Sequence, residues 1–171
     1  MLTQHKEMTP EEFLAYEAQH QDKRFDFIDG EMVEVTPNDV HGRIQIELGT
    51  EFTLYLRKNP IGRAYTEVLH VLNGEKMMPD ICIHVTGTTD YFTTPPLVAV
   101  EIRSESQTKS AQRDKALAYI RAGVKMSILI FPGEWIEVHR PDREPLKLSF
   151  GDTLNGDDVL PGFSVKVDSF L

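Results

Sequence analysis

The run MPDICIHV occupies residues 78–85, and the run LVAVEIR follows at residues 97–103 after a polar loop. Both runs are rich in apolar and β-branched residues, and each carries a carboxylate, Asp80 in the first and Glu101 in the second. The second run is almost entirely apolar, which predicts a central strand that is buried on both faces of a sheet. An unpaired carboxylate in such a strand is expensive, so Glu101 is a candidate functional residue. Asp80 follows a proline, and opening a strand after a turn is its alternative role.

Helices are predicted on either side of these two strands. One runs from about His41 to Lys58 with an apolar stripe of Ile44, Leu48, Phe52 and Tyr55. The next follows the capping segment 104–108 and ends at Gly123. Further strands are expected at residues 63–72, 126–131, 135–139 and 146–150, with a short apolar run at residues 163–167. From His41 onward the order is helix, strand, strand, strand, helix, strand, which indicates an α/β chain with a mixed α+β sheet.

The N-terminal part of the chain is predicted to form a helix and a hairpin. Thr9 is the N-cap of a helix that runs to about His20, and Glu12 closes a capping box with it. The alternating run at residues 25–35 contains Asp29-Gly30, which is the strongest short-range signal for a hairpin turn.

The composition is that of an ordinary globular protein. The chain has 171 residues, of which 40% are hydrophobic and 26% charged, and this length predicts a single domain over residues 1–171. It contains no signal-peptide-like run and no apolar stretch long enough for a membrane, and Cys82 is its one cysteine. We therefore expect a cytoplasmic protein without a membrane partner. The net charge of −9 argues against a broad basic surface for nucleic acid.

Polar residues lie close to the buried stripe of the helix 41–58. His41 and Glu51 fall within or beside the stripe, and Glu47 borders it. Because a buried polar group must find a partner, these residues are either satisfied structural groups or members of a site. The structural role is the simpler one for each.

Several different short motifs follow one another in a characteristic order along nearly the whole chain. They are residues 8–14, residues 27–31, His41, Pro79-Asp80, Val100-Glu101-Ile102 with Ser104, Lys115 with Tyr119, residues 122–124 and residues 160–163. Together they resemble the PD-(D/E)xK superfamily, the restriction-endonuclease-like fold, and within it the Uma-two family of endonucleases. The resemblance implies a restriction-endonuclease-like core of helix, strand, strand, strand, helix and strand. The N-terminal helix and hairpin precede this core, and extra C-terminal strands follow it.

The resemblance also implies a metal-dependent nuclease site. Hydrolysis of a phosphodiester requires neutralisation of charge on the phosphate and a hydroxide near neutral pH, and one or two Mg²⁺ or Mn²⁺ ions supply both. Mg²⁺ prefers oxygen ligands and takes one or two carboxylates from a protein. Asp80 and Glu101, on adjacent strands, would supply them, and the family resemblance adds the main-chain carbonyl of Ile102.

A lysine completes such a site by orienting the attacking water or stabilising charge on the phosphate. The superfamily usually places it two residues after the acid, but that position here is Arg103, whose guanidinium can hold a phosphate and cannot act as a base. The family resemblance instead points to Lys115 on the following helix, with Tyr119 one turn further along the same face. Taken without the resemblance, Lys115 belongs to a charged, solvated patch.

The sequence departs from the family pattern near this lysine. Ala111 stands where an acid commonly precedes the lysine by four residues, and Ser104-Glu105-Ser106 replaces a Ser-Pro-Ser run. Asp26 stands where glutamate is more common. The acids and the histidine that are secondary candidates for a second metal or a water are Asp26, His41, Glu47 and Glu51.

Two functional hypotheses follow. The first is a Mg²⁺-dependent endonuclease that hydrolyses DNA through Asp80, Glu101 and Lys115. The second is a catalytically weak or inactive domain of the same fold that binds nucleic acid or protein; the acidic net charge and Ala111 favour it. A homodimer is expected from the resemblance alone.

Overall fold

Residues 8–21, 23–35, 38–85 and 90–171 are described by the computed structural model. The helices are α1 (Pro10–Gln19), α2 (Asp39–Lys58), α3 (Lys109–Arg121) and the short 3-10 helix η1 (Val167–Ser169). The strands are β1 (Arg24–Ile28), β2 (Glu31–Val35), β3 (Arg63–Tyr65), β4 (His70–Leu72), β5 (Glu75–Met77), β6 (Ile81–His84), β7 (Val98–Ile102), β8 (Met126–Phe131), β9 (Trp135–His139), β10 (Leu146–Leu148), β11 (Thr153–Asn155) and β12 (Ser164–Lys166).

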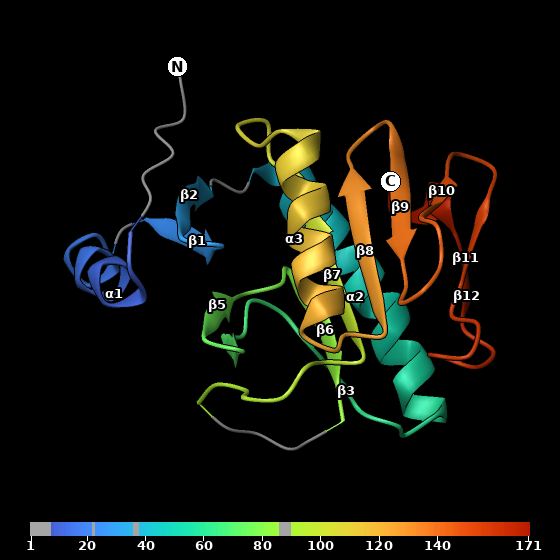
Figure 1. Ribbon diagram of the computed structural model, residues 1–171. Coiled ribbons are helices and arrows are strands. Elements are labelled where there is room, and N and C mark those ends of the chain that lie inside the picture. The colour runs from blue at the N-terminus through green and yellow to red at the C-terminus, as the bar shows by residue number, and fades with distance from the viewer. Residues whose placement is uncertain (1–7, 22, 36–37, 86–89) are drawn as a thin grey trace.

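A six-stranded mixed sheet lies between α2 and α3. Its strand order is β10-β9-β8-β7-β6-β3, and only the pair β7–β8 is parallel. Every residue of β7 is buried, which confirms the predicted central strand. Val98 and Val100 pack in the cluster that includes α2, whereas Ala99 between them packs with Tyr119 of α3. In Figure 1 α3 lies in front of this sheet and α2 behind it.

The predicted α+β fold class is confirmed, but the strand expected at residues 63–72 is wrong. The structure divides it into β3, at the edge of the six-stranded sheet, and β4, in a separate four-stranded sheet of order β2-β1-β5-β4. The break lies at Glu67, whose φ of 55° is in the left-handed region and whose N–H donates to the carbonyl of Pro79 at 3.2 Å. Such a backbone is uncommon for glutamate, so the sequence carried no signal for it.

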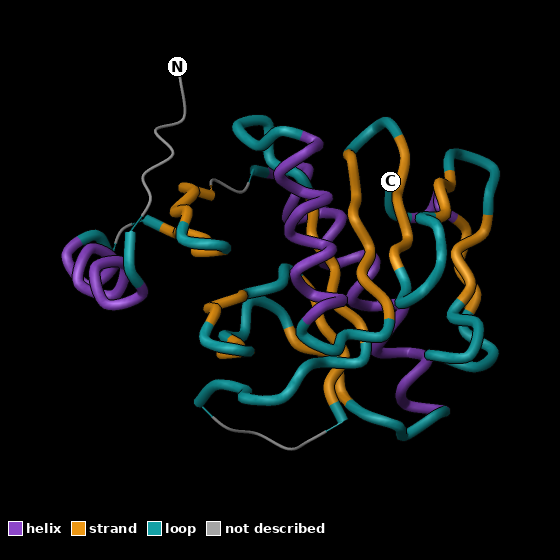
Figure 2. Tube along the Cα trace, in the orientation of Figure 1, coloured by secondary structure: helices purple, strands orange, loops and turns teal. Residues whose placement is uncertain are grey.

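The N-terminal helix and hairpin are confirmed. Thr9 and Glu12 form the predicted capping box, and the Asp29-Gly30 turn has φ values of 52° and 82°, both in the left-handed region that a type I′ hairpin turn requires. The rings of Phe13 and Phe27 stack at 4.8 Å between their centroids. This unit stands to one side of the six-stranded sheet and joins the rest of the chain through the pairing of β1 with β5 (Figure 2).

The helices around the sheet begin where their capping residues stand. The side chain of Asn38 accepts from the N–H of His41, and that of Thr108 accepts from the N–H of Ala111. The fourth member of the buried stripe of α2 is Leu56 and not the expected Tyr55, which is half-buried and donates to the Pro161 carbonyl. No helix in the described part of the chain has the length and apolarity needed to cross a membrane.

Several strand bounds in the second half of the chain also differ from prediction. The run 146–150 forms only the three-residue β10, and the run 163–167 forms β12 and the start of η1. The strands β5 and β11, each of three residues, were not expected. Segments this short are fixed by their partners in the sheet, and their own sequence gives little indication of them.

His70, His84 and Phe92 form a buried histidine cluster. Phe92 stacks on His84 at 3.9 Å between ring centroids and lies 5.1 Å from His70. The Nδ1 of His70 donates to the carbonyl of Val68 at 2.9 Å, and its Nε2 is buried without a hydrogen-bond partner among the described residues. Burial, with a smaller contribution from His84, lowers the pKa of His70 to about 4 from 6.5 in spite of the Val68 bond.

We expect this histidine to make folding sensitive to mild acid. Above pH 6.5 His70 is neutral in the folded and unfolded chains, but between pH 6.5 and about 4 only the unfolded chain takes up the proton, so stability falls across this window. The expected loss near pH ~4.5 is about 1–2 kcal/mol after allowance for solvent screening. Urea unfolding at pH ~7.5 and ~4.5 measures it. His70→Asn keeps a donor for Val68 and does not titrate, so an equal pH dependence in this variant would contradict the assignment.

Candidate functional site

The two acidic residues of the opening runs, Asp80 and Glu101, meet at one end of the paired strands β6 and β7, inside the six-stranded sheet. Strands β6 and β7 pair with Ile81 opposite Val100, and the same antiparallel register places Asp80, directly before β6, opposite Glu101. Residues that lie opposite each other in an antiparallel pair point to the same face of the sheet. Asp80 is 2% exposed and Glu101 3% exposed, so both carboxylates are almost completely buried.

Asp80 is held by groups from three elements. Its Oδ2 accepts from the N–H of Ile102 at 2.7 Å and lies 3.2 Å from Nε2 of His41, at the start of α2. Burial by itself raises the pKa of Asp80, but the contacts with His41, Lys115 and the Ile102 amide outweigh it and hold this pKa below its usual value. Asp80 is therefore ionised at neutral pH.

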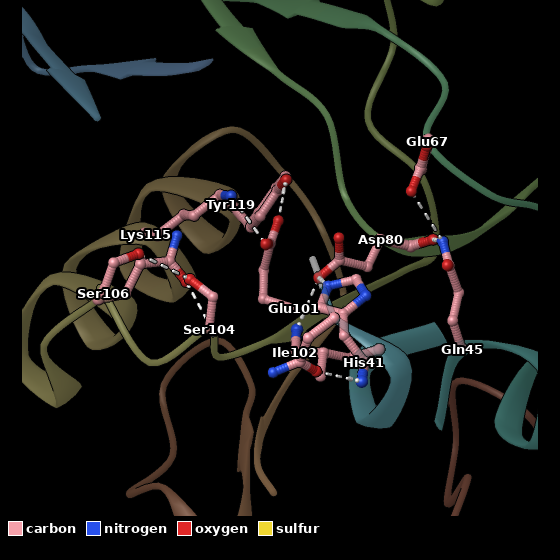
Figure 3. A network of polar contacts seen from close by, with 12 residues as sticks. His41, Gln45, Glu67, Asp80, Glu101, Ile102, Ser104, Ser106, Lys115 and Tyr119 are labelled. Carbon is pink, nitrogen blue, oxygen red and sulfur yellow. Dashed lines mark hydrogen bonds and ion pairs between the residues drawn. The ribbon is translucent and has the colours of Figure 1, made fainter. Parts of the chain in front are cut away.

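Glu101 is held by two side chains of α3 (Figure 3). The Nζ of Lys115 donates to Oε2 of Glu101 at 2.7 Å, and the hydroxyl of Tyr119 donates to Oε1 at 2.7 Å. Lys115 and Tyr119 are four residues apart and lie on the same helix face. The positive charge of Lys115 also contributes to the lowered pKa of Asp80, so it acts on both carboxylates.

His41 lies beside Asp80 in this site. Membership of a site was one of the two roles that the sequence left open for it. His41 is 2% exposed, and its Nδ1 has no hydrogen-bond partner among the described residues. Its Nε2 is within ion-pair distance of Asp80 but is not directed as in a well-formed hydrogen bond. A buried ring nitrogen without a protein partner is the kind of group that a water or a ligand satisfies.

Gln45 belongs to the site and was not among the sequence candidates. Its amide Nε2 donates to the main-chain carbonyl of Asp80 at 2.8 Å and lies 3.4 Å from Oε1 of Glu67 (Figure 3). The one signal that could have found it is its spacing, since Gln45 follows His41 by four residues and so shares its helix face.

The remaining secondary candidates lie elsewhere. The guanidinium of Arg103 pairs with Glu134 at 3.5 Å and donates to the carbonyl of Gln107, and Glu47 pairs with Arg43. Glu51 is ten residues after His41, or about 15 Å along α2. Asp26 lies in β1 of the four-stranded sheet, and its side chain is outside the described part of the chain.

The donor set suits a hard divalent cation. Two carboxylates on one face and a nearby main-chain carbonyl are what Mg²⁺ needs, because this ion keeps several of its waters. The described residues contain no group of three or more His, Cys, Asp or Glu side chains that could hold a metal ion. Each oxygen of Glu101 already accepts a bond from α3, so a metal bound by Glu101 would share these oxygens with Lys115 or Tyr119.

A mixed sheet between two helices, with two acids and a lysine near one another, is the arrangement that the resemblance to the restriction-endonuclease-like class implies. A family model described as "Putative restriction endonuclease", Uma2, matches residues 10–168. The chain belongs to this family, which confirms the resemblance found in the sequence.

One solved structure that resembles the chain is "a putative nuclease belonging to DUF820" from Anabaena variabilis ATCC 29413. The two chains are 20% identical and superpose with a TM-score of 0.84, over 95% of this chain and 97% of the other. At this identity the likeness establishes the fold alone. A comparison with functionally curated proteins gave no match.

Proposed function

We propose that the protein is a Mg²⁺-dependent endonuclease that hydrolyses DNA phosphodiester bonds at Asp80, Glu101 and Lys115. The observation that supports this most directly is the 2.7 Å contact between Nζ of Lys115 and Glu101, opposite Asp80 in the strand register. A charged patch on a solvated helix face would not place this ammonium group inside the protein. Membership of the Uma2 family supports the same class of activity.

Each residue has a distinct role in the proposal. Asp80, Glu101 and the carbonyl of Ile102 would hold Mg²⁺ or Mn²⁺, which supplies a hydroxide at neutral pH and neutralises charge on the phosphate. Lys115 donates to the attacking water or to a phosphate oxygen as negative charge develops there. Tyr119 is a positioning residue that fixes the carboxylate of Glu101, since its hydroxyl donates to Oε1 of that group.

One observation favours the alternative of an inactive binding domain. Asp80, Glu101 and Lys115 are each at most 5% exposed, and Lys115 satisfies a carboxylate that a metal would need. In a nuclease the Glu101 oxygens would be shared between Lys115 and the metal, whereas an inactive domain keeps this bond as a structural ion pair. The two functions therefore differ in whether a divalent ion changes the activity and the melting temperature of the protein.

Removal of the metal provides the test. We expect supercoiled plasmid or single-stranded DNA to be cut in the presence of Mg²⁺ or Mn²⁺ and to remain intact with EDTA, as followed on gels over time. The same ions should raise the melting temperature in a concentration-dependent way, because a ligand of the folded state stabilises it. No cleavage over a range of DNA and RNA substrates, with no shift in melting temperature, would support the binding domain instead.

The setting of this activity is part of the same proposal. We propose that residues 1–171 form one domain that acts in the cytoplasm, where DNA is present and where a lone thiol stays reduced. Cys82 is buried, and burial raises the pKa of its thiol to about 12, which leaves it as a core residue. A homodimer remains an expectation from the family resemblance, and light scattering would measure it.

A further inference from the structure

A groove of about 450 Å³ runs between α2 and the edge strand β3, beside the candidate site. Its lining is made of small, hydroxyl-bearing and aliphatic residues with a single cation: Gln45, Ile46, Gly49, Thr50, Thr53, Leu54, Arg57, Ala64, Tyr65, Thr66 and Ile81. None of these residues carries a carboxylate, although 27 of the 171 residues in this chain are Asp or Glu. The groove is thus a path without a carboxylate in its lining, and Glu67 lies beside it at Gln45.

One end of the groove lies beside the main chain of Asp80. Gln45 lines the groove and donates to the carbonyl of Asp80, and Ile81 directly follows Asp80 in the chain. From Gln45 the groove follows α2 to Arg57, a distance of about 18 Å along the helix axis. A chain molecule lying in the groove would therefore come next to the backbone of Asp80 at the Gln45 end.

The other end of the groove is basic. Arg57 lines it, and the exposed side chains of Lys58 and Arg63 lie next to it in sequence and at the start of β3. No ion pair of these three cations with another residue occurs in the part of the chain that the structure describes. Many other cations of the chain are paired, for example Lys76 with Glu17 and Arg113 with Glu137. Unpaired cations at the end of a carboxylate-free groove are suited to phosphate.

The walls of the groove favour bases that are not paired. Ile46 is 73% exposed and Leu54 45% exposed, so α2 presents two aliphatic side chains along the same path. A duplex turns its phosphates outward and keeps the faces of its bases stacked inside, so it could use the cations but not these side chains. An unpaired strand offers apolar base faces and phosphates together.

We propose that the groove between α2 and β3 binds single-stranded nucleic acid and leads it to Asp80 and Glu101. The inference rests on the proposed nuclease function for its direction and adds the class of substrate, an unpaired strand or flap. Arg57 contacts a phosphate at the far end, and Ile46 and Leu54 contact bases between Arg57 and the site.

Gly49 allows the groove to be closed without damage to the fold. A Cβ at this position would meet no atom within 4 Å, and glycine inside a helix is less favourable than alanine by about 0.8–1.0 kcal/mol, with leucine ranked close to alanine. Gly49→Leu should therefore fold with an equal or higher melting temperature and still fill the groove. Gly42→Leu is the matched control, because Gly42 is another glycine of α2 whose Cβ would meet no atom within 4 Å, and it does not line the groove.

The experiment measures binding of a fluorescein-labelled oligothymidylate of about 12 nucleotides by anisotropy in EDTA, so that no cleavage occurs. We expect Gly49→Leu to weaken binding at least ~10-fold and Gly42→Leu to bind as the wild type does. Arg57→Ala should reduce the slope of log affinity against log salt by about 0.7, the value for one contact to a single strand. Arg121→Ala removes an arginine from the last turn of α3 instead and should leave the slope unchanged.

Several results would overturn the proposal that the groove binds single-stranded nucleic acid. They are no binding of the oligonucleotide by the wild type, equal binding by Gly49→Leu, tighter binding of a duplex of the same length, or a Gly49→Leu effect on dimerisation alone, which would assign the groove to a second copy of the chain. Cleavage of single strands by Gly49→Leu at the wild-type rate would reject the groove and leave the nuclease proposal standing. Binding at the groove without cleavage under any condition would reject the nuclease proposal and leave the groove standing.

Discussion

Lys115→Met is expected to lower the cleavage rate by about 10²–10³-fold, the usual cost of removing one donor that stabilises charge in a transition state. The same change should destabilise the protein by about 3–5 kcal/mol, because it leaves Glu101 buried without its cation. Methionine has nearly the length of lysine, so packing changes little. Single-turnover cleavage and urea unfolding measure the two effects separately.

A second substitution separates catalysis from folding in this prediction. Glu101→Gln removes the buried negative charge, so the double variant Glu101→Gln/Lys115→Met should regain most of the stability lost by Lys115→Met. It should regain none of the cleavage, since both proposed catalytic groups are absent. If Lys115→Met were destabilised but cleaved DNA at the wild-type rate, Lys115 would be a structural partner of Glu101 only.

Asp80→Asn is expected to reduce Mg²⁺ affinity and cleavage by more than about 100-fold each. An amide keeps an acceptor for the Ile102 N–H but removes the charge that a divalent ion requires. Isothermal titration with Mg²⁺ and cleavage assays measure the loss. Asp114→Asn is the matched control, because Asp114 is exposed on α3 beside Lys115 and makes the same change of charge. Wild-type Mg²⁺ affinity in Asp80→Asn would remove this residue from the metal site.

The pH dependence of stability provides an independent check on Asp80. Its pKa is lowered in the folded protein, so its ionised form contributes stability that is present above the unfolded pKa of 3.8 and is lost as the pH falls below that value. The wild type should therefore lose more stability than Asp80→Asn between neutral pH and about pH 3. Asp80 acts below pH 3.8, whereas His70 acts between pH 6.5 and about 4, so the two effects can be distinguished by the pH at which they occur.

The elements that depend on local signals were predicted well. The apolar run of β7, the Asp29-Gly30 turn and the capping box at Thr9 each specify their structure within a few residues, and the structure contains all three. The split of residues 63–72 was not predictable, because it depends on a left-handed glutamate that is held by a residue twelve positions later, Pro79. Long-range contacts of this kind leave no pattern in the local sequence.

The candidate site was partly predictable for a similar reason. Asp80 and Glu101 stand out because a carboxylate interrupts an apolar strand, whereas Lys115 follows Arg113 and Asp114 and looks solvated. In the structure Asp114 is exposed, Arg113 turns to Glu137, and Lys115 alone enters the protein. Only the family resemblance separated Lys115 from its neighbours, and nothing in the sequence distinguished Gln45 from any other glutamine of a helix.

The left-handed turn at Glu67 bears on how the site meets its substrate. Its N–H binds the residue before Asp80, while Gln45 binds the carbonyl of Asp80 itself and lies beside the Glu67 carboxylate. The main chain on both sides of this peptide unit is thus fastened by groups that are already in place when the chain has folded. In the proposed nuclease, substrate binding would then have no backbone to order at this position, so the entropic cost of alignment would be met during folding and not in each catalytic cycle.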